Sequence, residues 1–345
     1  MYAVKNRDIP GRETSAAGRD YFWDNLRCFL IILVIWCHGV ETARGYSELL
    51  RTVHETVLSF LMPTFVFVTG YFAKGMAKEG EKRLKICNLL LLYTLFQVAH
   101  MIVRGSSSFL KPAYGGWYLM GIMVWYLVLP IVSRFKPWAA IGVSVLAAAL
   151  CGMDPAVTKA LQLSRLICFF PFFLLGYYCT GETGNKLKEK HVRIAEGAAL
   201  AAMIVFCLVW WTKMAPLGIL HAHKTFAEMK IVLGKGVLLR IAWYIVATMM
   251  GFGFLALVPR KRVPILSTLG TRTLPIFVWH VQLYSIIACK TDLFPMIGER
   301  FGAAAMLIYF LAAIVFALLF GSKWAAKPLD ILMKYRFTPF LNKSK

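Results

Sequence analysis

The chain of 345 residues is divided into apolar blocks, each close to the length of a membrane-spanning helix, which are separated by short loops. A helix needs about 20 apolar residues to cross the hydrocarbon core, whereas barrel strands are short and alternate. Hydrophobic residues make up 59% of the chain and charged residues 16%. In soluble domains about 45–50% of the residues are apolar and about 25% are charged. The pattern predicts an all-α, polytopic integral membrane helical bundle.

About ten transmembrane helices are predicted within a membrane domain at 21–321, between an N-terminal tail at 1–20 and a basic C-terminal tail at 322–345. The fifth is short for a full crossing. The candidate spans cover 24–41, 54–73, 84–103, 117–133, 138–153, 163–180, 193–212, 236–258, 272–288 and 302–321.

Lys and Arg are more numerous in the loops that share a side with both termini, and such an excess marks the cytoplasmic side. We therefore expect cytoplasmic N- and C-termini and a multi-pass protein of the plasma or inner membrane. Residues 1–20 are polar and no small-residue cleavage site follows the first span. That span is expected to be a retained anchor.

The net charge of +22 would suggest nucleic-acid binding in a soluble protein. Here the basic residues lie in short loops beside lipid headgroups, without interleaved stacking aromatics, so we expect the lipid bilayer as a partner and no nucleic acid. The eight cysteines form neither a CxxC nor a Cys/His metal spacing. His221 and His223 lack a third ligand in the sequence, so no metal is expected.

The first predicted span, "YFWDNLRCFLIILVIWCHGVE", contains Arg27 and His38. Their separation of eleven residues places them about 16 Å apart along a helix. Around the helix axis they differ by only about 20°, so both side chains lie on the same face. A fixed cation at the cytoplasmic entrance and a titratable base further in suit a large anionic ligand that enters from the cytosol. Glu41 follows His38 by one turn, within reach of its imidazole. The alternatives are a snorkelling arginine and a histidine that only packs.

His280 falls near the midplane of the ninth predicted span, where Pro275 can free a backbone carbonyl. Ionisable groups within a membrane are costly, so each is a candidate functional residue. For His280 the alternative is a packing histidine bonded to a neighbouring helix.

Further stretches occur in a fixed order along the chain: "YFWDNLR", "MPTFVFVTGYF", "KRLK", "GGWYL", "SRLICFFPFFLLGYY" and "TLPIFVWHVQLY". Together with the spacing of Arg27 and His38, they make the chain resemble the membrane-bound acyltransferase-3 family, most closely its fucose 4-O-acetylase-like branch. The resemblance implies an O-acyltransferase that moves an acyl group, usually acetyl from cytosolic acetyl-CoA, to a hydroxyl of a carbohydrate or cell-envelope glycan.

The resemblance also implies roles for individual residues. His38 would be the general base, with Glu41 orienting it, and Arg27 would bind or orient the CoA. The family often has two arginines after its second span, whereas "KRLK" offers a lysine at each end, which lacks the bidentate geometry of arginine. Supporting phosphate contacts are expected from Lys82, Arg83 and Lys85, and substrate contacts from Trp117, Tyr118, Arg165 and His280.

Direct transfer and a two-step route through an acyl-enzyme both fit these residues. A rival function is a transporter or flippase for a lipid-linked saccharide, which would use Arg27, His38 and His280 for coupling or substrate binding. The absence of an internal repeat and the shortage of membrane carboxylates count against it. A structural envelope protein would tolerate substitution of Arg27 and His38.

Overall fold

A computed structural model of the chain describes residues 20–77, 79–105, 109, 112, 115–159, 161–180 and 189–334. These residues form helices joined by turns, and no strand occurs among them. The longer helices are α1 (Tyr21–Glu41), α2 (Glu48–Tyr71), α3 (Glu79–Arg104), α4 (Gly116–Val132), α5 (Pro137–Leu150), α7 (Leu163–Tyr178), α9 (Lys190–Phe206), α12 (Leu233–Leu257), α14 (Thr273–Lys290), α16 (Ala305–Phe320) and α17 (Lys323–Lys334).

Shorter helices connect the long ones. They include η1 (Arg44–Tyr46), η2 (Phe72–Ala77), η3 (Cys151–Met153), α6 (Pro155–Lys159), the π-helical turn η4 (Cys207–Trp211), α10 (Thr212–Met214), α11 (Leu217–His221), α13 (Pro264–Gly270), α15 (Leu293–Phe301) and η5 (Gly302–Ala304).

Each of the ten predicted spans contains a helix, which confirms the all-α fold class. The described residues include six helical segments that are long and apolar enough to cross a membrane, while α4, α5 and α7 are apolar but shorter. The chain is thus an integral membrane protein, and its exact number of crossings and the cytoplasmic termini stay predictions. The six segments are Tyr21–Glu41, Glu48–Lys74, Lys85–Arg104, Lys190–Met214, Leu233–Leu257 and Leu293–Phe320.

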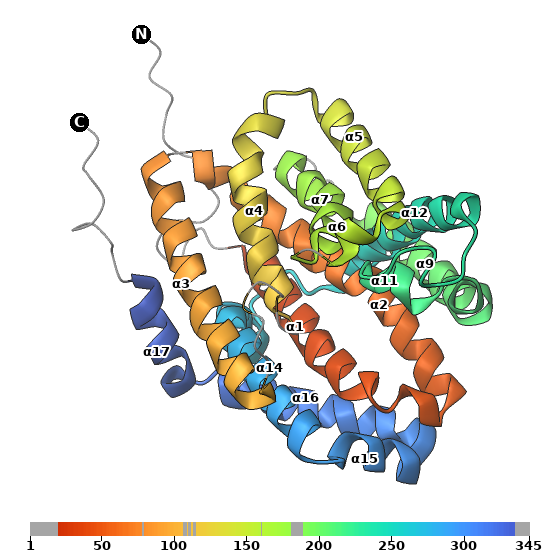
Figure 1. Cartoon of the computed structure of the whole chain (residues 1–345). Coiled ribbons are helices and arrows are strands. Elements are labelled where there is room, and N and C mark those ends of the chain that lie inside the picture. The colour runs from red at the N-terminus through yellow and green to blue at the C-terminus, as the bar shows by residue number, and fades with distance from the viewer. Residues whose placement is uncertain are drawn as a thin grey trace.

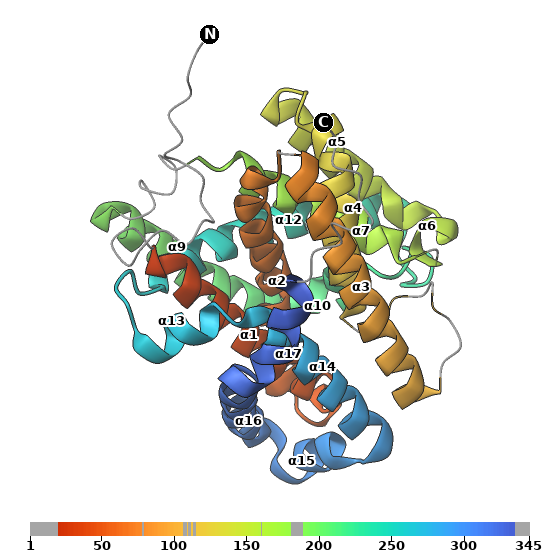
Figure 2. The same ribbon diagram turned by 90° about the vertical axis from the view of Figure 1, so that its left-hand side faces the viewer.

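Helix α1 lies in the middle of the bundle, where it packs against α2, α13, α14 and α16. Its apolar residues are buried, and Leu26, Leu30 and Ile31 have no exposed surface. In Figure 1, α3 and α17 lie on one side of α1 and α9 and α12 on the other. Figure 2 shows α15 and α16 together at one end of the molecule, opposite α5. Among the polar residues of α1, Asp24 and Asn25 are therefore buried, whereas Arg27, His38 and Glu41 are half-buried.

Helices α2 and α7 pack backbone against backbone. A Cβ added at Gly70 would overlap the Phe173 carbonyl oxygen, and one added at Gly176 would overlap that of Phe67. Small residues within a span permit this close approach of two helices. This contact holds the C-terminal parts of both helices in fixed register.

Helix α4 begins inside the bundle rather than at its end. Gly115 caps it in the left-handed conformation, with φ of 83°, which glycine adopts without steric cost. A Cβ at Gly115 would lie 3.2 Å from Val281, and one at Gly116 would lie 3.3 Å from Phe96. This start brings the next two aromatic residues, Trp117 and Tyr118, to the interior.

The predicted C-terminal tail is helical where the structure describes it. Trp279 Nε1 donates to the Ala325 carbonyl over 2.8 Å, and Asn88 Nδ2 donates to that of Met333 over 2.9 Å. These bonds tie α17 to α14 and α3. The tail predicted from residue 322 therefore begins with a helix docked on the bundle, and residues 335–345 lie outside the description.

Candidate active site

His38 is half-buried in the bundle and lies beside a second, fully buried histidine. Its ring stacks on that of His280, with centroids 5.4 Å apart and planes inclined by 21°, and the Tyr284 ring is 5.5 Å away. Two predicted site residues, from α1 and from α14, are thus brought together although 242 positions separate them in the sequence.

The hydrogen bonding of His280 fixes its tautomer. Nδ1 lies 2.8 Å from the Ile276 carbonyl oxygen, so Nδ1 carries the proton that it donates. Nε2 then bears a lone pair, and it has no hydrogen-bond partner among the described residues, although His280 is only 1% exposed. An unsatisfied buried acceptor is costly unless water or a ligand hydroxyl occupies the space beside it.

A small cavity adjoins both imidazoles, and its volume of about 20 Å³ is enough for about one water molecule. It lies between α1, α14 and α16. Its lining includes His38, Gly39, His280, Tyr284, Phe294 and Tyr309.

Tyr118 and Trp117 lie near this pair, at the inner start of α4. The Tyr118 hydroxyl is 2.6 Å from Thr69 Oγ1, and its ring contacts Phe277, which in turn contacts His280 at 5.8 Å between centroids. The Arg165 guanidinium carbon is 5.3 Å from the centre of the Trp117 ring. All four predicted substrate residues therefore belong to one connected region around the histidine pair.

Arg27 lies at the opposite end of α1. It pairs with Asp24, its Nε donates to the Trp23 carbonyl over 3.3 Å, and its guanidinium lies 5.0 Å from the Phe72 ring centre. The side chain is 27% exposed, and that of Asp24 is 4% exposed. Guanidinium has five N–H donors, so the pair leaves donors for an anion.

The basic cluster after α2 is described in part. Lys85 Nζ lies 5.2 Å from the centre of the Tyr126 ring. The side chains of Lys82 and Arg83 lie outside the described residues, although both belong to α3.

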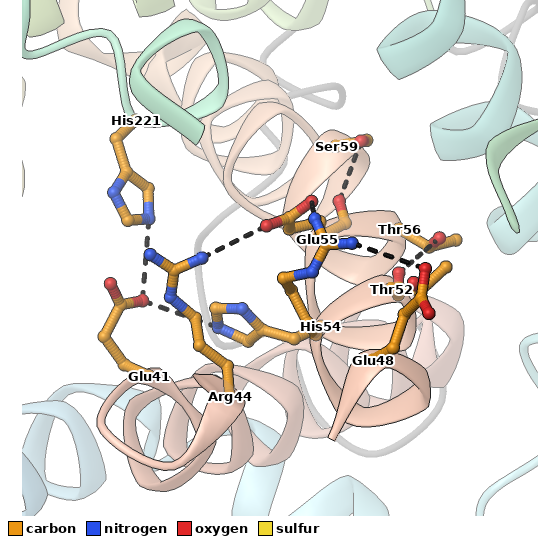
Figure 3. Close-up of polar contacts among 10 residues, drawn as sticks. Glu41, Arg44, Glu48, Thr52, His54, Glu55, Thr56, Ser59 and His221 are labelled. Carbon is orange, nitrogen blue, oxygen red and sulfur yellow. Dashed lines mark hydrogen bonds and ion pairs between the residues drawn. The ribbon is translucent and has the colours of Figure 1, made fainter. Parts of the chain in front are cut away.

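Glu41, at the end of α1, contacts two histidines that the sequence analysis did not assign to the site. Its Oε2 is 3.5 Å from His54 Nε2 and 3.8 Å from His221 Nε2. Figure 3 shows the carboxylate between the two rings. Orientation of His38 by Glu41 stays a prediction, because the carboxylate has these two other imidazoles beside it.

An ion pair lies next to Glu41. Arg44 Nη1 contacts Glu55 Oε1 at 3.1 Å, and the Glu55 side chain is 5% exposed (Figure 3). Arg51 lies 3.8 Å from the other Glu55 oxygen. The carboxylate of Glu55 is thus compensated by two guanidinium groups.

The segment that carries His221 is fastened to the bundle through its carbonyl oxygens. Arg165 Nε donates to the His221 carbonyl over 3.0 Å, and Ser164 Oγ donates to that of Ala222 over 2.7 Å. Arg240, which is 1% exposed, donates to the Ile219 carbonyl over 2.9 Å. Two arginines within predicted spans thereby hold α11 against the site.

His221 and His223 lie between the candidate spans, and both are kept neutral at neutral pH. Burial, followed by the charge of Arg165, places the pKa of His221 well below its ordinary value. Burial, Arg165 and Lys224 lower the pKa of His223 to about 4. Each ring can therefore both donate and accept a hydrogen bond.

A polar pocket of about 370 Å³ opens at this end of α1. We call it the outer pocket, and its lining residues are Glu41, Arg44, Pro216, Leu217, Gly218, His221, His223, Lys224 and Met229. Another cavity, of about 420 Å³, is instead apolar, lies between α4, α5 and α7, and has none of the predicted site residues in its lining.

Two residues of this site, His54 and His221, were missed by sequence reasoning. They come from α2 and α11, and no spacing along the chain relates either of them to Glu41. Only their residue type could have indicated them, because an ionisable residue such as histidine within or at the edge of a span is a candidate functional residue. Among the described residues, no group of three His, Cys, Asp or Glu side chains could hold a metal ion.

The fold defines the chain as a polytopic membrane protein, and its candidate site is a group of polar residues within the helical bundle. The family model described as "Acyltransferase domain", that of the acyltransferase-3 family, matches residues 20–322. The chain therefore belongs to the acyltransferase-3 family and is a membrane acyltransferase. Neither the curated proteins nor the solved structures contain a match to it.

Proposed function

We propose that this chain is an O-acyltransferase that moves an acyl group, acetyl in the first instance, from acyl-CoA to a hydroxyl of a carbohydrate or cell-envelope glycan. The observation that carries the proposal is the stacked pair of His38 and His280 beside a buried cavity, in a chain of the acyltransferase-3 family.

His38 acts as the general base in this proposal. Its neutral imidazole takes the proton of the acceptor hydroxyl while the hydroxyl oxygen attacks the thioester carbonyl. The C–S bond then breaks, and the CoA thiolate takes up the proton from the imidazolium. His280 holds one face of the His38 ring at a centroid distance of 5.4 Å, which restricts the imidazole to one orientation.

The acyl donor enters at the end of α1 that carries Arg27. The pair with Asp24 and the Trp23 carbonyl fixes the guanidinium, which then offers its remaining donors to a CoA phosphate. Lys85, with Arg83 and Lys82 in the same turn region of α3, supplies further positive charge. The distance of about 16 Å from Arg27 to His38 along the helix is bridged by the pantetheine arm.

The competing function is transport of a lipid-linked saccharide. Purified chain in proteoliposomes with acetyl-CoA labelled in its acetyl group distinguishes the two. We expect label to appear in the glycan fraction of added membranes, with release of one CoASH per acetyl group. Movement of saccharide across the bilayer without transfer of label would refute the proposed function.

A further inference from the structure

The outer pocket begins at Glu41, about one helical turn from His38 along α1. We propose that the outer pocket is the acceptor subsite, and that it binds a neutral, hydroxyl-rich saccharide unit through the Glu41 carboxylate. This inference rests on the proposed acyl transfer at His38 and adds to it the place and the chemical class of the acceptor.

The size and lining of the outer pocket suit such a ligand. Its volume of about 370 Å³ is at the lower end of the roughly 300–1,000 Å³ typical of ligand sites. Carboxylate, imidazole, guanidinium and ammonium groups converge on it from α1, η1 and the α11 segment. This mixture of donors and acceptors matches the hydroxyl groups of a sugar ring.

Glu41 is the acceptor group best held in this pocket. Both of its imidazole contacts involve Oε2, and in Figure 3 the other oxygen is turned away from the two rings. His54, which has no exposed surface and is absent from the pocket lining, lies 3.5 Å from Oε2. Oε1 is then free to accept hydrogen bonds from saccharide hydroxyls.

The charged groups that line the outer pocket balance one another, and such a site favours a neutral ligand. Arg44 is paired with Glu55 at 3.1 Å, and the Glu41 carboxylate is offset by the Lys224 ammonium group. His221 and His223 are neutral at pH 7, because burial and Arg165 lower their pKa values. Glu41 would repel the carboxylate of an acidic sugar.

The outer pocket also lies within reach of the reaction centre. Glu41 follows His38 by three residues, which is about 4.5 Å along the helix axis. A sugar ring held at Glu41 can therefore place one hydroxyl at the His38 imidazole. The donor would approach from the Arg27 end and the acceptor from the Glu41 end of the same helix.

The test is protection of an engineered thiol in the outer pocket. Met229→Cys, at an uncharged and half-buried lining residue that leaves the charges of the pocket intact, is introduced into a Cys87→Ser/Cys289→Ser background, because the other six cysteines are buried. The full chain in detergent is labelled with a maleimide, without acyl-CoA, in the presence of methyl hexosides or of the corresponding methyl hexuronides. We expect methyl hexosides to slow labelling several-fold and hexuronides to have little effect.

Two controls make the result specific. Adding Glu41→Gln should remove the protection without changing the labelling rate measured in the absence of sugar, which also shows that the pocket is still folded. Lys213→Cys, an exposed site outside the outer pocket, should be labelled at the same rate with and without sugar.

Protection by hexuronides alone, protection that survives Glu41→Gln, or no protection would each overturn the inference. Labelling requires no acyl transfer, so the two proposals fail separately. Protection without any acetyl transfer would refute the proposed function, and transfer without protection would refute the acceptor subsite.

Discussion

Arg27 provides a quantitative test of the donor end of α1 when Asp24, with which it pairs, is changed together with it. The Asp24 side chain is only 4% exposed, so removing Arg27 alone would break a largely buried ion pair, which typically costs about 3–5 kcal/mol of stability. The double substitution Asp24→Asn/Arg27→Gln removes both charges and keeps two hydrogen-bonding groups of similar size. It therefore separates loss of donor binding from loss of folding.

A charge-assisted hydrogen bond to a CoA phosphate is worth about 1.5–3 kcal/mol. At about 1.4 kcal/mol for each factor of ten, the double variant should raise the KM for acetyl-CoA by about 10- to 100-fold. The single variant Asp24→Asn keeps the guanidinium charge and should leave this KM unchanged or lower. Initial rates with labelled acetyl-CoA measure both values, and the melting temperature in detergent checks folding.

The reasoning is refuted if the double variant folds and its KM for acetyl-CoA equals that of the unchanged chain. Arg27 would then be a structural residue that pairs with Asp24, and the donor site would have to lie elsewhere. A rise in KM of the same size in Asp24→Asn would point to local distortion instead of lost phosphate binding.

Three further perturbations have defined outcomes. Gly70→Ala, which places a methyl group on the Phe173 carbonyl oxygen, should lower the free energy of unfolding by about 1–3 kcal/mol or more. The control Gly142→Ala, whose added methyl group would have nothing within 4 Å, should be neutral or stabilising. Equal melting temperatures of the two variants would contradict this prediction. His280→Phe keeps a ring beside His38 but removes the Nε2 acceptor. Its kcat should fall by up to about 100-fold, with the KM for acetyl-CoA unchanged. A kcat equal to that of the unchanged chain would count against a role of the His38–His280 pair in the reaction. Because burial, Arg165 and Lys224 lower the pKa of His223 to about 4, the folded state binds fewer protons than the unfolded state between pH 6.5 and 4. Stability should therefore be lost as pH falls through that window, and His223→Asn should show a smaller loss of melting temperature there.

The fold class was predictable because hydrophobic length is a local property. The ten apolar stretches all contain helices, and the close approach at Gly70 follows from a small residue within a span. The docking of α17 was not predictable, since it depends on hydrogen bonds from Trp279 and Asn88 that lie far away in the sequence.

The candidate site likewise has features that were predictable from the sequence and features that were not. The common face of Arg27 and His38 follows from helical periodicity within one helix. The contact of His38 with His280, and those of Glu41 with His54 and His221, join different helices. Only the packing of α1 against its neighbours brings these residues together, so spacing along the chain could not reveal them.

The central claim is that His38 is the general base, and the most direct measurement is acetyl transfer by His38→Ala. Removing a general base should reduce the rate by about 100- to 10,000-fold, with the amount of protein in the membrane and its melting temperature retained. The matched control is His191→Ala, because the His191 side chain is 80% exposed and distant in sequence from the site. It should transfer acetyl at the rate of the unchanged chain. Undiminished transfer by a folded His38→Ala variant would contradict the account.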